Sequence, residues 1–115
     1  MIFLPPPDTK LSTERILSYR ALRFSRNDTT PLTGFDENEY MSNSNFHSRT
    51  LSDILNEWQT IRNATVSLFS SLNEEMADRK GVANNITVTP RIILYFILVH
   101  ERHHVNLIKE RYLLS

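Results

Sequence analysis

Residues 89–113 have the sequence TPRIILYFILVHERHHVNLIKERYL, and this stretch decides the fold. Thr89 is a residue type favoured at a helix N-cap, and Pro90 follows at the first helical position, where its missing N–H costs no hydrogen bond. The pattern therefore predicts a helix over about 90–113. Residues 92–99 are all apolar, which is typical of a helix at the centre of a bundle. Its inward face is predicted to carry Ile93, Ile97, His100, His104 and Leu107.

Three histidines fall within five residues of this predicted helix, at His100, His103 and His104. His100 and His104 are i and i+4 neighbours on one helix face, with Cβ atoms about 6 Å apart, and two imidazoles so placed can share one metal ion. His103 points about 100° away from His104 and is less suited as a ligand. The alternative is that these histidines are half-buried polar residues, or favourable charges near a helix C-terminus.

Working outward, two further helices are predicted. Apolar residues at helical spacing predict one over about 12–26, which the breaker cluster 27–31 ends. Thr50 and Asp53 resemble a capping box, and the apolar period that follows predicts a helix over about 51–72. Further single turns are predicted at 36–40 and 73–76.

Between the first two helices lies a polar, aperiodic loop over 32–48, of a length often found in a functional lid or rim. No stretch alternates clearly between polar and apolar residues, so the fold class is predicted to be all-α.

Composition sets further bounds on fold and function. The 115 residues are 40% hydrophobic and carry 13 basic and 13 acidic side chains, so we expect a single domain and no general attraction to nucleic acid or anionic membranes. There is no cysteine, which excludes disulfides, thiolate nucleophiles and cysteine-bound metals. The N-terminal stretch lacks the features of a signal peptide, and the apolar run 92–99 is too short to cross a bilayer, so a cytoplasmic location is predicted.

Several stretches together resemble the DinB-like family, also called the DinB/YfiT-like metalloenzymes. They are TERILSYRALRF at 13–24, TPL at 30–32, GFDE at 34–37, SRTL at 48–51, HERHH at 100–104 and KERYL at 109–113. The resemblance runs in order and spacing from Thr13 to the C-terminus and leaves residues 1–11, a proline-containing segment, outside. It implies an up-down helical bundle of the four-helix type that lacks the family's first helix, so that the helix over 12–26 corresponds to the family's second.

The resemblance also implies a site. Members of the family are frequently homodimers and hold a divalent metal with three histidines, one on the second helix and two in an H-x-x-x-H pair on the fourth. His100 and His104 match the pair, whereas the position of the third histidine is Thr9 here. Water, Glu14, a residue of a partner chain or His47 from the long loop are the candidates to complete the site. Glu14 is therefore predicted as a metal ligand or as the acceptor of a histidine N–H, and alternatively as an ordinary first-turn glutamate favoured by the helix dipole.

Two functions follow from these expectations. The first is a metal-dependent transferase, acting on thiols, or a hydrolase, with zinc, nickel or iron as the divalent ion, since imidazole suits all three. The second is a non-catalytic helical interaction or dimerisation module, in which loss of the first helix leaves an apolar face that a homodimer would cover. Neither interpretation identifies the substrate.

Other residues receive weaker interpretations. Glu101 and His103 are expected to be solvated, and Tyr19 and Trp58 to lie in the core or in a pocket wall. Four arginines step along the first predicted helix and are interpreted either as an anion-binding row or as a solvated face: Arg15, Arg20, Arg23 and Arg26.

Overall fold

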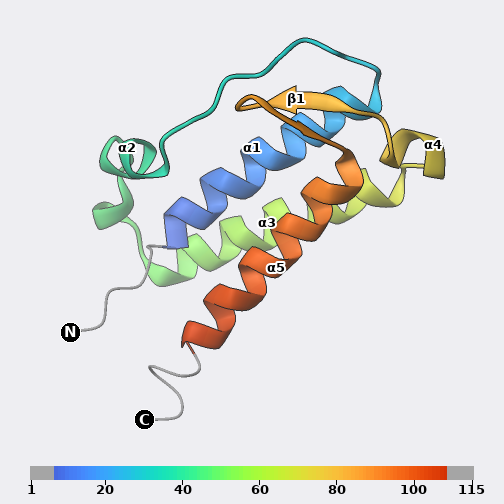
Figure 1. The fold of residues 1–115 in the computed structure, drawn as a ribbon. Helices are drawn as coiled ribbons and strands as arrows, with labels where there is room; N and C mark the ends of the chain where they lie inside the picture. The colour runs from blue at the N-terminus through green and yellow to red at the C-terminus, as the bar shows by residue number, and fades with distance from the viewer. Residues whose placement is uncertain (1–6, 109–115) are drawn as a thin grey trace.

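The computed structural model describes the backbone of residues 7–108 and the side chains of residues 11–99 other than His47. Three long helices dominate it (Figure 1): α1 (Pro7–Ser25), α3 (Leu51–Ser70) and α5 (Pro90–Ile108). The shorter elements are α2 (Glu37–Ser42), a 3₁₀ turn (Phe46–Ser48), α4 (Glu74–Ala77), and the strands β1 (Gly81–Ala83) and β2 (Ile86–Val88). The predicted all-α class is confirmed.

Helix α1 is the centre of the bundle, because it packs against both α3 and α5. Two clusters of buried side chains lie along it. One contains Ala21, Phe24, Ala83, Ile93 and Ile97, and the other Leu11, Ile54 and Ile61. The prediction that the helix beginning at Pro90 is central is therefore wrong. That helix presents one face to α1 and leaves much of its remaining apolar surface exposed. No helix within residues 7–108 is long and apolar enough to cross a membrane.

The three long helices do not simply alternate in direction. Leu11 packs near Ile54 and Ile61, and Ser18 lies further along α1 beside Thr65, so α1 and α3 run parallel. Helix α5 runs antiparallel to both (Figure 1). The parallel pair is possible because the segment after α1 returns along the bundle to its starting end before α3 begins (Figure 1).

The returning segment is anchored to the rest of the fold. Leu32 N–H donates to the carbonyl of Val82 at 2.9 Å, and the Thr13 hydroxyl donates to Glu37 at 3.2 Å. The predicted turn at 36–40 is present as α2, with Asp36 as its N-cap. These hydrogen bonds hold the returning segment against β1 and α1.

The helix ends follow local rules. The N–H of Asp53 bonds the Thr50 hydroxyl at 3.1 Å, and the N–H of Ile92 bonds the Thr89 hydroxyl at 3.2 Å, so both predicted caps are confirmed. Helix α1 begins at Pro7, earlier than the predicted start near 12, since proline is well tolerated in the first turn. At its other end Asn27 has φ 63°, and the N–H of Asp28 reaches the carbonyl of Arg23, which together form a Schellman cap.

A two-stranded hairpin is present where the sequence predicts no strand. β1 and β2 are antiparallel, with Gly81 opposite Val88, and Asn84 and Asn85 between them have φ 51° and 64°. Two successive positive φ angles give the type I′ turn that suits a tight hairpin. Each strand has three residues, which is too short for the alternation of polar and apolar residues to be visible in the sequence.

Candidate functional site

The two positions of the predicted histidine pair, 100 and 104, fall within α5, whose backbone the structure describes. Ile93 and Ile97 are buried against α1, which confirms these two positions of the predicted inward face. Positions 100 and 104 lie three and seven residues beyond Ile97, so the four positions follow the i, i+4, i+7, i+11 spacing of one helix face. The side chains of His100, His103, His104 and Leu107 lie outside the described side chains, as does that of His47. Their role as ligands stays a prediction.

Glu14 is the predicted site residue whose surroundings are described, and it lies in a buried polar cluster between α1 and α3. Its side chain is 3% exposed. Arg62 donates to both carboxylate oxygens, from Nη2 to Oε1 at 2.8 Å and from Nε to Oε2 at 3.1 Å. Thr65 donates to Oε2 at 2.8 Å, and its hydroxyl lies 3.2 Å from that of Ser18. A carboxylate held in this way has a fixed orientation and a balanced charge.

Arg62 lies at the edge of the core and contacts both an aromatic ring and a carboxylate. Its guanidinium lies 5.5 Å from the centre of the Trp58 ring, in a cation–π arrangement, while its forked donors engage Glu14. Trp58 itself packs against the cluster of Leu11, Ile54 and Ile61, as expected for a core residue. A buried pair of this kind is tolerated because each charge is hydrogen-bonded as well as paired.

These contacts bear on the roles predicted for Glu14. Residue 14 lies about two turns after the start of α1 at Pro7, so the interpretation as a first-turn glutamate does not hold. A guanidinium on the carboxylate disfavours a divalent cation at the same oxygens, because like charges repel. Within the described residues there is no group of three or more His, Cys, Asp or Glu side chains arranged to hold a metal ion.

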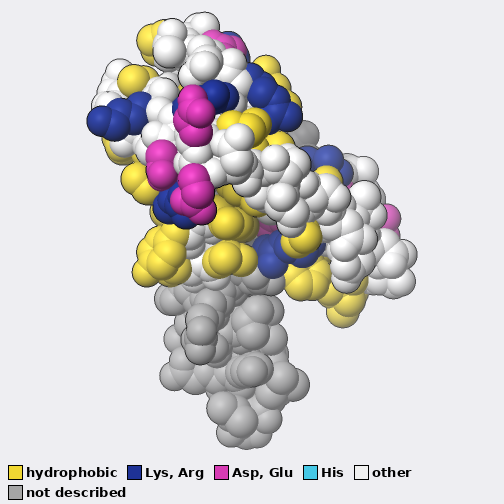
Figure 2. Space-filling view, turned by 90° about the vertical axis from the view of Figure 1, so that its right-hand side faces the viewer, with side chains coloured by type: hydrophobic (Ala, Val, Ile, Leu, Met, Phe, Trp, Pro, Cys, Tyr) yellow, Lys and Arg dark blue, Asp and Glu magenta, His cyan; other side chains and the backbone are white. Residues whose placement is uncertain are grey.

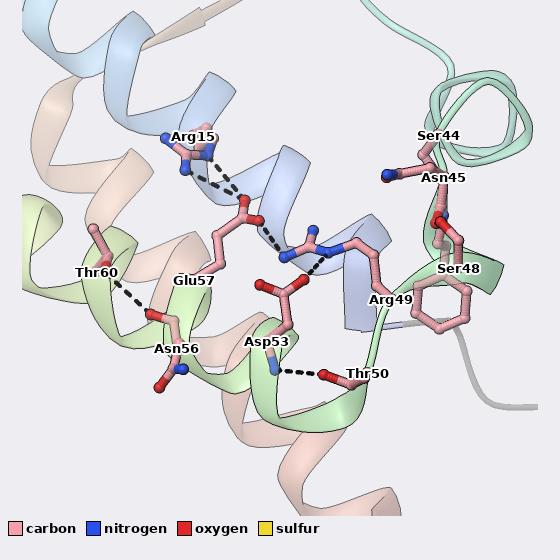
Figure 3. Close-up of polar contacts among 11 residues, drawn as sticks. Arg15, Ser44, Asn45, Ser48, Arg49, Thr50, Asp53, Asn56, Glu57 and Thr60 are labelled. Carbon is pink, nitrogen blue, oxygen red and sulfur yellow. Dashed lines mark hydrogen bonds and ion pairs between the residues drawn. The ribbon is translucent and has the colours of Figure 1, made fainter.

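A second polar network fixes the start of α3 to α1 (Figure 3). Arg49 bonds Asp53 and Glu57, each at 2.7 Å, and Glu57 also accepts from Arg15 at 3.3 Å. The hydrogen bond that Arg49 donates to Asp53, followed by the one that it donates to Glu57, raises the pKa of Arg49 above its usual value. Arg15 is thus held by a carboxylate of α3.

The other arginines of α1 also have local partners. Arg20 donates to the carbonyl of Thr33 at 2.8 Å, and burial lowers its pKa. Arg23 bonds Asp28 at 2.7 Å, and Arg26 donates to the Ser25 hydroxyl at 2.8 Å. These contacts connect α1 to neighbouring segments and stabilise its C-terminal end. The arginines are therefore described well neither as an anion-binding row nor as a simply solvated helix face.

Two remaining features complete the description of the surface. Tyr19 is exposed, so the expectation that it lies in the core or a pocket wall is wrong. An open cavity of about 480 Å³ lies over the returning segment and α2, lined by Gly34, Phe35, Asp36, Glu39, Tyr40 and Asn43. Among the candidate metal ligands whose side chains the structure describes, Glu14 does not line it.

Fold and site together define a small all-α protein in which the last helix carries an H-x-x-x-H pair and the neighbouring helix carries a buried glutamate. The family model of the DinB superfamily matches residues 11–108, and the chain belongs to that superfamily. No curated protein and no solved structure matches the chain.

Sequence reasoning missed Arg62, Thr65 and Ser18 as partners of Glu14. A signal was present, since Arg62 stands four residues after Trp58 and three before Thr65, on the apolar side of its helix. A charged residue there requires an opposite charge from another element. The sequence alone does not say which acid supplies it.

Proposed function

We propose that this protein binds a divalent metal ion through His100 and His104 and uses it in a transferase reaction on thiols or in a hydrolysis. The observation that supports this proposal is the match to the DinB superfamily. The match covers residues 11–108 of the chain and so includes the histidine pair on α5. When bound, such an ion lowers the pKa of water or a thiol and so supplies a nucleophile at neutral pH.

The arrangement of α1 and α5 supports this proposal. Because α5 is antiparallel to α1, the chain beyond Ile97 runs toward the half of α1 that carries Glu14 (Figure 1). Glu14 is held by Arg62 and Thr65. In this proposal its carboxylate accepts the N–H of a ligating imidazole, which selects the tautomer that binds the metal, and does not bind the metal itself.

Metal content tests the proposal directly. Protein purified without a histidine tag is dialysed against zinc or nickel and analysed by elemental mass spectrometry. The wild type should retain close to one ion per chain, and His100→Ala and His104→Ala should lose it. His103→Ala is the matched control, because it removes an adjacent imidazole that lies off the predicted ligand face, and it should retain the metal.

Glu14→Gln separates the two roles of the glutamate. Loss of an acceptor behind a ligand typically weakens metal affinity by about 10–100-fold, whereas loss of a ligand abolishes binding at a two-histidine site. Far-UV circular dichroism of each variant checks that it is folded. Wild-type protein that stays metal-free under these conditions contradicts the proposal, as does a loss in His103→Ala equal to that in His104→Ala.

A second candidate function is a non-catalytic interaction module. The observation that favours it is the exposed apolar surface of α5, where Ile92, Tyr95, Phe96 and Val99 are each about half exposed or more. Exposed apolar patches of this kind mark association sites on protein surfaces that are otherwise polar. Under this function the protein remains metal-free in the same elemental analysis and acts through its binding partner.

A further inference from the structure

The open cavity beside α2, which we call the α2 cavity, lies in the segment that the sequence predicts as a functional lid or rim. Its volume of about 480 Å³ is in the range of small-molecule sites. Two aromatic side chains line it, Phe35 and Tyr40, whose ring centres are 5.3 Å apart and whose planes meet at 51°. The two rings therefore give the cavity a bent aromatic surface.

The polar groups of the α2 cavity are mainly hydrogen-bond acceptors. Asp36 and Glu39 contribute carboxylates. The amide nitrogen of Asn43 donates to the backbone carbonyl of Glu39 at 2.9 Å, which leaves the side-chain oxygen of Asn43 as an acceptor. Residues 34–43 as a whole contain three acidic side chains and no basic one. A ligand that matches this lining is therefore a hydrogen-bond donor with a positive charge.

The carboxylates of the α2 cavity differ from those that have basic partners elsewhere. Arg91 bonds Glu74 at 2.8 Å and Asp78 at 2.9 Å, and on the face drawn in Figure 2 acidic and basic side chains lie next to one another. Among the described side chains, no basic group pairs with Asp36 or Glu39. Asp36 accepts two backbone N–H groups as the N-cap of α2, so its orientation is fixed while its charge has no cationic partner there.

One guanidinium of the chain already lies on this aromatic surface. The Cζ atom of Arg20 is 5.5 Å from the centre of the Phe35 ring, and its Nη2 donates to the carbonyl of Thr33 at 2.8 Å. The Phe35 ring thus attracts a planar cation in this fold. Tyr40 is 50% exposed, and among the described side chains no cation lies over its ring. The Tyr40 ring is therefore accessible to a cation from solution.

We propose that the α2 cavity binds a small organic cation, such as an alkylguanidinium. Its head donates hydrogen bonds to the carboxylates of Asp36 and Glu39, and its carbon chain lies against the ring of Tyr40. The site is separate from the proposed metal site, because Glu14 does not line the cavity. Its test therefore does not depend on the outcome of the metal analysis.

Other classes of small molecule match the α2 cavity less well. An anion would face the carboxylates of Asp36 and Glu39, and like charges repel. An uncharged apolar molecule would displace water from these carboxylates without giving them a hydrogen bond, which is unfavourable. An organic cation satisfies the acceptors and the aromatic surface together.

An NMR titration of isotope-labelled protein provides the first test, with butylguanidinium and its uncharged isostere butylurea as probes. The chain has two glycines: Gly34 lines the α2 cavity, and Gly81 lies on β1 as the internal reference. The amide signal of Gly34 should shift to saturation with a millimolar dissociation constant, while that of Gly81 stays unchanged. Butylurea should bind at least about tenfold more weakly, because it has no charge for the carboxylates or the rings.

Charge variants on α2 test the role of the carboxylates. Glu39→Gln should raise the dissociation constant of butylguanidinium about threefold or more. Glu37→Gln is the matched control: it removes the same charge from the same helix, but Glu37 does not line the cavity, so the affinity should stay close to that of the wild type. Asp36→Asn retains a side chain that caps the helix, and combined with Glu39→Gln it should weaken binding about tenfold.

Aromatic variants complete the test. Tyr40→Phe keeps the ring and should keep the affinity, whereas Tyr40→Leu should raise the dissociation constant about threefold. Far-UV circular dichroism checks that each variant is folded. A Gly34 signal that does not respond to butylguanidinium overturns the proposal. Equal affinities for butylguanidinium and butylurea, or equal effects of Glu39→Gln and Glu37→Gln, also overturn it.

Discussion

Removing the guanidinium of Arg62 is the sharpest test of how α1 and α3 are held together. In Arg62→Met the aliphatic stem stays, but the carboxylate of Glu14, which is 3% exposed, loses the cation that bonds both of its oxygens. Breaking a buried ion pair from one side costs about 3–5 kcal/mol, because an uncompensated charge remains in the core. For a chain of this length, that loss corresponds to a fall in melting temperature of about 12–20 °C.

The reasoning is checked by urea unfolding followed by far-UV circular dichroism. Adding Glu14→Leu to Arg62→Met should recover about 2 kcal/mol or more, because the buried charge is removed. Arg15→Met is the matched control: its partner Glu57 forms a largely exposed pair, and the loss should stay below about 1 kcal/mol. A double variant no more stable than Arg62→Met alone would refute the argument that the unpaired carboxylate causes the loss.

Three further predictions concern the hairpin and the end of α1. In Gly81→Ala the added methyl group would overlap the Phe24 ring, so a loss of about 1–3 kcal/mol is expected by thermal unfolding. Asn85→Val places a β-branched residue at φ 64°, which should cost about 1–2 kcal/mol, whereas Asn85→Gly should keep wild-type stability. The hydrogen bond from Arg23 lowers the pKa of Asp28 from 3.8 to about 2. Its folded-state pKa is thus below the unfolded value, so its stabilisation is present above about pH 4 and is lost as the pH falls through 2. Stability curves of wild type and Asp28→Asn should therefore converge in acid, and a constant gap across this range would exclude the ion pair as the cause.

Much of the fold was predictable because its signals are local. Thr50 and Thr89 act as caps through bonds to residues three positions away, so sequence spacing suffices to find them. The hairpin was not predictable from alternation, since strands of three residues contain too few positions. Asn84 and Asn85 were the available signal, because asparagine tolerates the positive φ of a type I′ turn.

The candidate site was predictable only in part. The histidine pair on the helix and the superfamily follow from the sequence, and the match over residues 11–108 confirms the superfamily. The partners of Glu14 come from a helix 48 and 51 residues further along the chain. Their identity depends on how α3 packs on α1, and a side-chain contact over such a separation leaves no periodic mark in the sequence.

By itself, the sequence determined the long helices, their caps, the all-α class and the superfamily, because caps and apolar periods act over a few residues. The tertiary structure alone decided which helix is central. Residues 92–99 are apolar on every side, yet a helix buries only the faces that its neighbours cover. Here α1 lies between α3 and α5, so α5 buries Ile93 and Ile97 and leaves Ile92, Tyr95, Phe96 and Val99 exposed. Burial is a property of the packing partners, and the sequence of one helix does not specify them.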